Sequence, residues 1–219
     1  MVKRRNKVIS FIIVLFGLTM LFVSATERIE GYIKTLSVQG ILLSILVLFD
    51  FEKFDILNFI FLIFETFIVK TIFIPFFLVK IVRKNDIQKE VESVIPNLYS
   101  LIIASIIFAL GFFISYWAIP FGNIFNPLYF GISFSTISIG LFIIIARKNI
   151  ITHIFGYMMM ENGIFLLSMS VAKEMSIIIN MGVLLDIFIG IYLLGLFANK
   201  IQAAFDTSHI DKLRQLKDE

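Results

Sequence analysis

Seven apolar runs, each about as long as a membrane is thick, constrain this chain more than any other feature. They cover residues 8–26, 35–51, 56–82, 98–119, 128–146, 150–171 and 176–199, and charged residues or prolines flank them. A helix of about 20 residues crosses the hydrocarbon core of a bilayer. Strand-like alternation of apolar and polar residues is absent from the sequence, which argues against a barrel. We therefore expect an all-α, polytopic integral membrane protein with about seven transmembrane helices.

The composition agrees with a membrane protein and excludes several other classes. The chain has 219 residues, of which 59% are hydrophobic and 16% are charged, whereas soluble domains have roughly 25% charged residues. It has no cysteine, so thiolate-ligated clusters and disulfides are excluded. Its net charge of +3 lies in connections and tails and forms no basic face for nucleic acid. The sequence contains no phosphate-binding loop, nucleophile elbow or metal-ligand cluster, and hence no active site.

The connections between the runs predict an orientation in the cell membrane, because cytoplasmic loops carry an excess of lysine and arginine. One side would carry the larger basic set, and we place that side, with the carboxy terminus, in the cytoplasm and the amino terminus outside. The basic start MVKRRNK and the residues VSA at 23–25 are also typical of a cleavable signal peptide, and its removal would leave six spans. The larger set is Arg28, Lys34, Lys80, Arg83, Lys84, Lys89, Arg147, Lys148, Lys200, Lys212, Arg214 and Lys217; the smaller is Lys3, Arg4, Arg5, Lys7, Lys53 and Lys173.

An internal repeat divides the chain. QGILLS at 39–44 resembles NGIFLLS at 162–168, and ETFIV at 65–69 resembles DIFIG at 186–190, in the same order. The first three and last three runs would then be diverged copies of one three-helix unit, in parallel orientation because one further span separates them. We predict an amino-terminal unit with its connecting loop (1–97), a linker helix and turn (98–127), a second three-helix unit (128–200) and a cytoplasmic tail (201–219).

Four charged side chains lie deep in the apolar runs, away from their ends: Glu65, Lys70, Glu161 and Asp186. Glu161 lies about 16 Å along the sixth run if that helix begins near residue 150, and Asp186 lies at a similar depth in the seventh. Two facing carboxylates there would not both stay ionised, so a proton would be held or passed between them. Ionisable residues inside spans usually mark ion or proton paths. We predict a relay of these four residues; the alternative is that protonated acids only hydrogen-bond neighbouring helices.

The relation between Glu65 and Lys70 is left open by their spacing. Residues five apart lie on different, though not opposite, faces of an α-helix, so a salt bridge between them would need a bend or fully extended side chains. Lys70 could instead meet a carboxylate of the second unit or a partner subunit. Pro75 follows in the same run and would kink the helix and free a carbonyl.

Other polar residues in the runs are weaker candidates. His153 lies three residues inside the sixth run, where either a solvated position at the interface or a role in proton entry fits. Gln39, Ser44, Asn162 and Ser168 are expected to tie helices together.

Residues 128–200 resemble the three-helix K subunit of respiratory complex I and its relatives in multisubunit sodium/proton antiporters. The shared features are a basic turn, ARKN at 146–149, then MENGIFLLS at 160–168, then LLDIFIGIYLLGL at 184–196, then a polar tail. The resemblance implies two mid-membrane acids in a central polar axis that links proton channels. Glu161 matches the first acid, and Asp186 matches the second with a shorter side chain than the usual glutamate.

The whole chain resembles the hydrogenase-4 component E family. That resemblance implies a membrane subunit that couples redox chemistry in other chains to proton or sodium movement, beside antiporter-like and other membrane subunits. It implies no cofactor in this chain, with Ni–Fe and Fe–S centres only in partner subunits. The alternatives are a purely structural scaffold subunit and a C-like component of a multisubunit Na⁺/H⁺ antiporter. A self-contained carrier is disfavoured because no pair of interrupted helices is evident.

Overall fold

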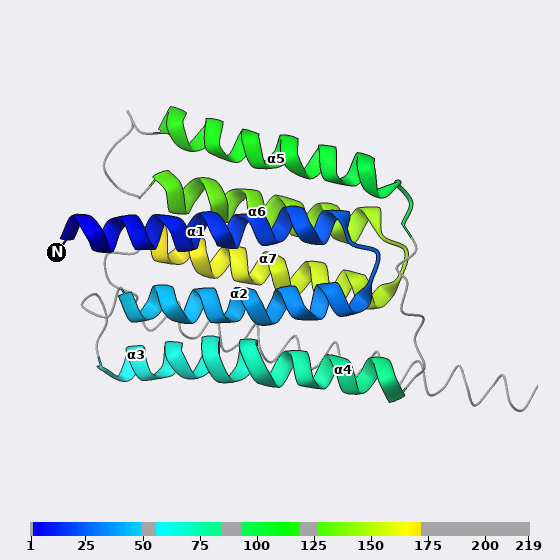
Figure 1. Ribbon diagram of the computed structural model, residues 1–219, viewed down its shortest axis with the longest axis horizontal. Coiled ribbons are helices and arrows are strands. Elements are labelled where there is room, and N and C mark those ends of the chain that lie inside the picture. Colours follow the sequence, from blue (N-terminus) through cyan, green and yellow to red (C-terminus); the bar gives the residue numbers. More distant parts are fainter. Residues whose placement is uncertain (1, 50–55, 85–92, 119–126, 172–219) are drawn as a thin grey trace, which may run out of the picture.

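The computed structural model describes residues 2–49, 56–84, 93–118 and 127–171. The helices are α1 (Val2–Ala25), α2 (Ile29–Phe49), α3 (Ile56–Ile63), the π-helix η2 (Phe64–Phe73), α4 (Ile74–Lys84), α5 (Asn97–Ala118), α6 (Pro127–Ala146) and α7 (Ile150–Val171). α3, η2 and α4 form one continuous rod, which lies beside the other helices in a bundle of alternating direction (Figure 1). Across the described residues, β-structure is confined to one isolated bridge between Ser93 and Arg147. The all-α prediction is therefore confirmed.

Five helical stretches in the described part of the chain are long and apolar enough to cross a membrane. They are Arg4–Ala25, Ile29–Phe49, Ile56–Lys80, Asn97–Trp117 and Pro127–Ala146. α7 is 22 residues long and is not among them; it is the helix that carries His153, Glu161 and Asn162. The predicted run at 176–199 lies outside the described residues. The prediction of a multi-pass membrane protein is thus confirmed.

The start of the second helix was predicted wrongly. We placed it at residue 35, whereas α2 begins at Ile29. The apolar run marks only the part of a helix that contacts lipid. The helix itself begins earlier, and its first turns include the charged residues Glu30 and Lys34, which are exposed on its surface. Glu30 lies in the first turn, where a negative charge favours the helix dipole.

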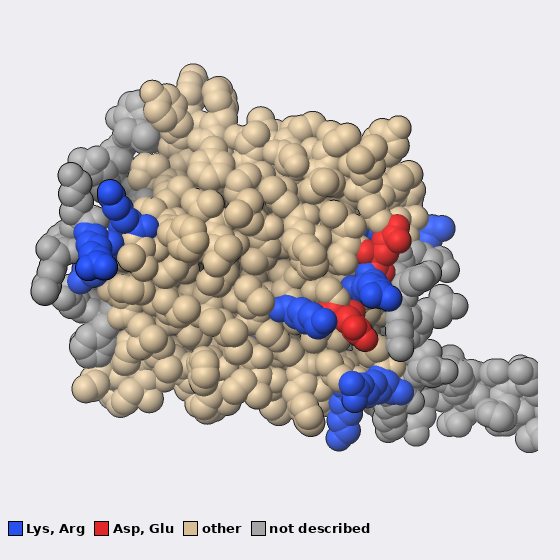
Figure 2. All heavy atoms as spheres, in the orientation of Figure 1, with Lys and Arg blue, Asp and Glu red and all other residues tan. Residues whose placement is uncertain are grey.

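The charged side chains shown in Figure 2 gather at the two ends of the bundle and leave its middle apolar. The α1–α2 and α6–α7 connections, the end of α4 and the start of α5 lie at one end, and the amino terminus lies at the other (Figure 1). The described residues therefore alternate between the two ends as the orientation prediction requires. Which end faces the cytoplasm stays a prediction.

α6 and α7 approach each other closely through glycines. A Cβ on Gly140 would lie 2.8 Å from the carbonyl oxygen of Gly156, and a Cβ on Gly156 would lie 2.8 Å from that of Gly140. A Cβ on Gly163, further along α7, would lie 2.9 Å from Cγ1 of Ile137. Small residues let membrane helices pack backbone against backbone. These contacts fix the rotation of α7 against α6.

α1 is a packed member of the bundle. Phe16, Met20 and Val23 are completely buried. Arg147, which follows α6, donates hydrogen bonds to the carbonyl oxygens of Ser24 at 3.0 Å and Thr26 at 3.4 Å. The last carbonyls of a helix lack partners within it, and a cation there complements the helix dipole. α1 is thus held in the bundle both by its buried face and by Arg147.

We predicted Arg147 to be a charged residue of a connecting loop, and its burial was not predicted. It is only 2% exposed, and its guanidinium also donates to the side-chain oxygen of Asn97, 3.0 Å away at the start of α5. The backbone of the same segment pairs with the residues before α5, because Val94 N–H donates to the carbonyl of Ala146 at 2.9 Å. Arg147 thus joins the ends of α1, α5 and α6.

Candidate functional site

Three of the four predicted ionisable residues meet inside the bundle. Lys70 Nζ lies 3.2 Å from Glu65 Oε1 and 2.9 Å from Glu161 Oε1. Glu65 is completely buried, Lys70 is 4% exposed and Glu161 is 8% exposed. Asp186 lies outside the described residues. We call Glu65, Lys70 and Glu161 the Lys70 cluster.

The π-helix η2 explains how Glu65 and Lys70 meet. In a π-helix each main-chain hydrogen bond spans five residues instead of four. Ile74 N–H accordingly donates to the carbonyl of Val69, and the Thr71 hydroxyl donates to the carbonyl of Thr66 at 2.9 Å. The wider turn brings a residue back over the one five positions earlier. On α-helical geometry we allowed this ion pair only with a bend or extended side chains, and the π-helix supplies the change of geometry. The alternative contact of Lys70 with a carboxylate of the second unit is also present, with Glu161.

Pro75 lies just after this segment. It is the second residue of α4 and has no N–H with which to bond the preceding turn. The π-helix ends at Phe73. We expected Pro75 to kink this helix. The departure from α-helical geometry is the π-helix, which begins at Phe64, well before the proline.

α7 approaches Lys70 with two residues of one face. Phe165 lies four positions after Glu161, so the two side chains are neighbours on the helix surface. Lys70 Nζ lies 5.1 Å from the centroid of the Phe165 ring, within the range of a cation–π interaction. The ammonium group therefore has a carboxylate and an aromatic face from α7 and a carboxylate from η2.

A second set of polar side chains joins α7 to α2 and α1 beside the cluster. Asn162 Nδ2 donates to Gln39 Oε1 at 3.0 Å. Gln39 Nε2 donates to Thr19 Oγ1 at 2.8 Å and lies 3.1 Å from Met20 Sδ. Gln39 and Asn162 are both buried. The expectation that these two amides tie helices together is confirmed.

Ser44 and Ser168 behave differently. Their hydroxyls donate to carbonyls one turn earlier in their own helices, those of Gly40 at 2.8 Å and Ile164 at 3.0 Å. This back-bonding is the common arrangement of serine inside a helix. The expectation that these two serines tie helices together was wrong.

Gly40 brings the backbone of α2 against the π-helix at Lys70. A Cβ on Gly40 would lie 2.5 Å from Thr71 Oγ1, 3.0 Å from Thr71 N and 3.1 Å from the carbonyl carbon of Lys70. Only glycine permits this approach. From the repeat we predicted only that Gly40 corresponds to Gly163; the contact of Gly40 with Lys70 was not predicted.

The charges of the Lys70 cluster do not balance. One ammonium and two carboxylates carry a net charge of −1 when all are ionised. A net charge in a buried site is costly unless it is paired. One proton, or one monovalent cation, would neutralise the three residues. Counted among these three side chains alone, the cluster thus has room for one further positive charge.

His153 lies away from the cluster, near the start of α7. Its Nε2 lies 2.7 Å from the carbonyl oxygen of Arg147, and its side chain is half-buried. It therefore lies at the end of α6, and both the interfacial position and a role in proton entry stay predictions. Across the described residues, no group of three or more histidine, cysteine, aspartate and glutamate side chains is placed to hold a metal ion.

Comparison with known proteins finds a family likeness over the carboxy-terminal part of the chain. Residues 128–218 match the family of NADH-ubiquinone/plastoquinone oxidoreductase chain 4L. This part of the chain contains α6, α7 and Glu161, and because of its similarity to that family we call it the chain 4L-like unit. The resemblance to the K subunit drawn from its motifs is thereby confirmed.

The particular relatives extend the likeness toward the amino terminus. The chain is 26% identical over 155 residues to hydrogenase-4 component E of Escherichia coli and of Shigella flexneri, which is 70% of this chain and 71% of each relative. It is also 26% identical over 86 residues to an uncharacterized protein of Mycobacterium tuberculosis. That match spans 39% of each of the two chains. No solved structure matches the chain.

Proposed function

We propose that this chain is a membrane subunit of a complex I-like or hydrogenase-4-type assembly. Within it, the Lys70 cluster and Asp186 form a station for protons or sodium ions whose movement is coupled to redox chemistry in other subunits. The observation that carries the proposal is the position of Lys70 between Glu65 and Glu161. The match of residues 128–218 to chain 4L and the likeness to hydrogenase-4 component E support the choice of assembly.

The geometry supports a hand-over of charge along the membrane plane. Glu161 belongs to the chain 4L-like unit, and Glu65 belongs to the amino-terminal unit, so Lys70 joins the two. A proton that arrives at Glu161 weakens its attraction for the ammonium, and Lys70 then pairs more strongly with Glu65. Loss of the proton reverses the preference. The flexible lysine stem lets the charge shift between the two partners without movement of a helix.

A scaffold function is the second candidate, and the same residues give it an observation of its own. Lys70 connects η2 to α7, so the cluster could serve only to hold the two helices together. A scaffold needs the polar contacts but no change of protonation. A relay needs at least one group that gains and loses a proton. Substitutions that keep shape and hydrogen bonding but remove titration separate the two functions.

The test is redox-driven ion uptake by the intact complex in sealed vesicles. Glu161→Gln and Asp186→Asn keep side-chain shape, and Glu27→Gln, at an exposed glutamate between α1 and α2, is the matched control. We expect all three variants to assemble, and we expect ion uptake to fall sharply only in the first two. Normal uptake in both, with normal assembly, would overturn the relay and favour the scaffold.

Two further arms define the ion and exclude a carrier. Uptake that requires sodium and persists with a protonophore identifies sodium, and uptake abolished by the protonophore identifies protons. The purified chain alone in liposomes is expected to transport neither ion. Transport by the chain alone would contradict its assignment as a subunit of a larger assembly.

A further inference from the structure

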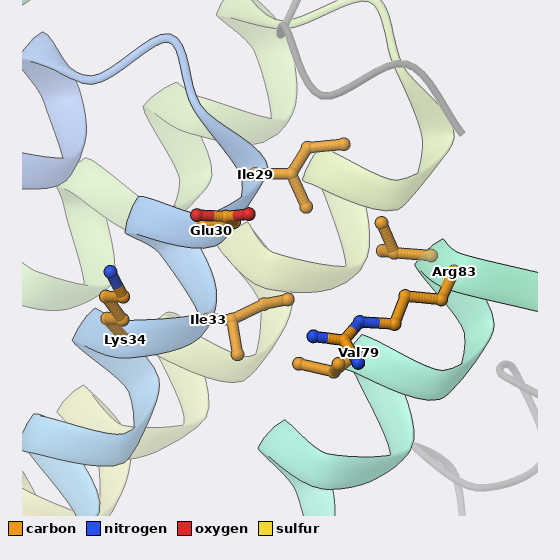
Figure 3. A pocket seen from close by; sticks show the side chains of 7 residues that line it. Ile29, Glu30, Ile33, Lys34, Val79 and Arg83 are labelled. Carbon is orange, nitrogen blue, oxygen red and sulfur yellow. The ribbon is translucent and has the colours of Figure 1, made fainter. Parts of the chain in front are cut away.

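A pocket opens between the beginning of α2 and the end of α4. Its volume is about 390 Å³. Ile29 and Ile33 of α2 and Val79 and Val82 of α4 form its apolar lining, and Figure 3 shows the two helices facing each other across it. These side chains suit hydrocarbon, whereas the remaining lining residues are charged.

The pocket lies at the depth of lipid head groups if the bundle spans a bilayer. Ile29 is the first residue of α2, and Arg83 is the last but one residue of α4. Arg28, Arg147 and Lys148 belong to the α1–α2 and α6–α7 connections, which lie at this end of the bundle (Figure 1). Residues at the ends of transmembrane helices lie in the polar interface of the membrane. A ligand of the pocket would thus have its apolar part toward the bilayer centre and its polar part at the interface.

Two cations and one carboxylate complete the lining. Arg83 extends from α4 toward α2, and Glu30 and Lys34 lie on α2 one turn apart (Figure 3). All three side chains are exposed. Within the part of the chain that the structure describes, neither Lys34 nor Arg83 forms an ion pair. The pocket therefore offers a net positive charge, and the guanidinium offers the paired donors that phosphate groups accept.

We propose that this pocket binds the head group and upper acyl chains of one anionic phospholipid. The phosphate contacts Arg83 and Lys34, and the acyl chains pack on Ile33 and Val79. Basic pockets between transmembrane helices are a recognised kind of site for anionic head groups. An apolar helix of a partner would bury both cations without an acceptor, which disfavours that occupant. Glu30 repels phosphate and lowers the affinity below that of a site with cations alone.

The lipid would stabilise the position of the helix that carries Glu65 and Lys70, because α4 directly continues η2. A molecule seated between α2 and α4 holds the end of this rod against α2. The proposal rests on the pocket and its charges and is independent of any ion movement through the chain.

The test measures lipid bound to the intact complex by native mass spectrometry after addition of phosphatidylglycerol or phosphatidylethanolamine. The double variant Lys34→Ala/Arg83→Ala is compared with Arg4→Ala/Lys7→Ala, two exposed cations near the opposite end of the bundle. Removal of two cations near the membrane surface is expected to lower phosphatidylglycerol binding by about tenfold or more. The control is expected to bind as the wild type does, and phosphatidylethanolamine is expected to bind weakly to all forms.

Three results would overturn the proposal: equal phosphatidylglycerol binding by the two double variants, equal retention of the two lipids by the wild type, or a protein segment in place of lipid. Should the Lys34/Arg83 variant fail to assemble, Glu30→Gln decides the question. Removal of this negative charge is expected to raise phosphatidylglycerol binding several-fold, and unchanged or weaker binding would count against the site.

Discussion

Replacement of Lys70 by methionine removes the only cation of the Lys70 cluster while nearly preserving side-chain volume. Glu65 and Glu161 would then remain buried without the ammonium that lies 3.2 Å and 2.9 Å from them. Removal of one partner of a buried ion pair costs about 3–5 kcal/mol of stability, because the remaining charge is left uncompensated. We expect Lys70→Met to lie within this range or above it, since two carboxylates each lose an ion pair with the same ammonium group.

The expected loss corresponds to a measurable change in thermal stability. For chains of 150–250 residues, 1 kcal/mol lowers Tm by roughly 2–4 °C, so Lys70→Met should unfold roughly 6–20 °C below the wild type. The assay is thermal unfolding of the detergent-solubilised complex, followed by loss of this subunit from the size-exclusion peak. Lys7→Met, at an exposed lysine of α1, is the matched control and should stay near wild type. If Lys70→Met unfolded at the temperature of this control, the three residues would not form the buried cluster described here.

Three further substitutions test the surroundings of the cluster by the same assay. Gly40→Ala places a methyl group 2.5 Å from Thr71 Oγ1 and should destabilise the complex by about 1–3 kcal/mol; wild-type stability would contradict the close approach of α2 to η2. Gln39→Leu leaves the buried amide of Asn162 without its acceptor and should cost about 1–3 kcal/mol, so an unchanged Tm would argue against this hydrogen bond. Gly156→Val should separate α6 from α7 and reduce the amount of assembled subunit, and full assembly would show that these helices do not pack through their glycines.

The helices were predictable from the sequence because contact with lipid requires apolar side chains along the whole length of a span. An apolar run of about 20 residues has few alternatives to a transmembrane helix, and the run at 128–146 nearly coincides with α6, Pro127–Ala146. Helix ends were less predictable, since α2 begins six positions before its apolar run. Exposed Glu30 and Lys34 extend the helix without extending the run, and no local sequence signal separates this extension from a loop.

The candidate site was predictable in its members but not in its geometry. Charge inside an apolar run singled out Glu65, Lys70 and Glu161 individually. Their meeting depends on the π-helical register of η2 and on the packing of α2 between η2 and α7, neither of which follows from a 3.6-residue period. Arg147 was misread for a related reason: its burial is set by three helix ends that lie far apart in the sequence.

A buried ion cluster is an inefficient means of holding helices together. Replacement of buried ion pairs by well-packed apolar residues is often neutral or stabilising, so a pure scaffold gains little from Glu65, Lys70 and Glu161. We expect the neutral triple variant Glu65→Gln/Lys70→Met/Glu161→Gln to regain most of the stability lost in Lys70→Met, because none of the three side chains then carries a charge. The same variant has no group in the cluster that can take up or release a proton. Wild-type stability without ion uptake would therefore separate the relay from the scaffold, and wild-type uptake in this variant would refute the relay.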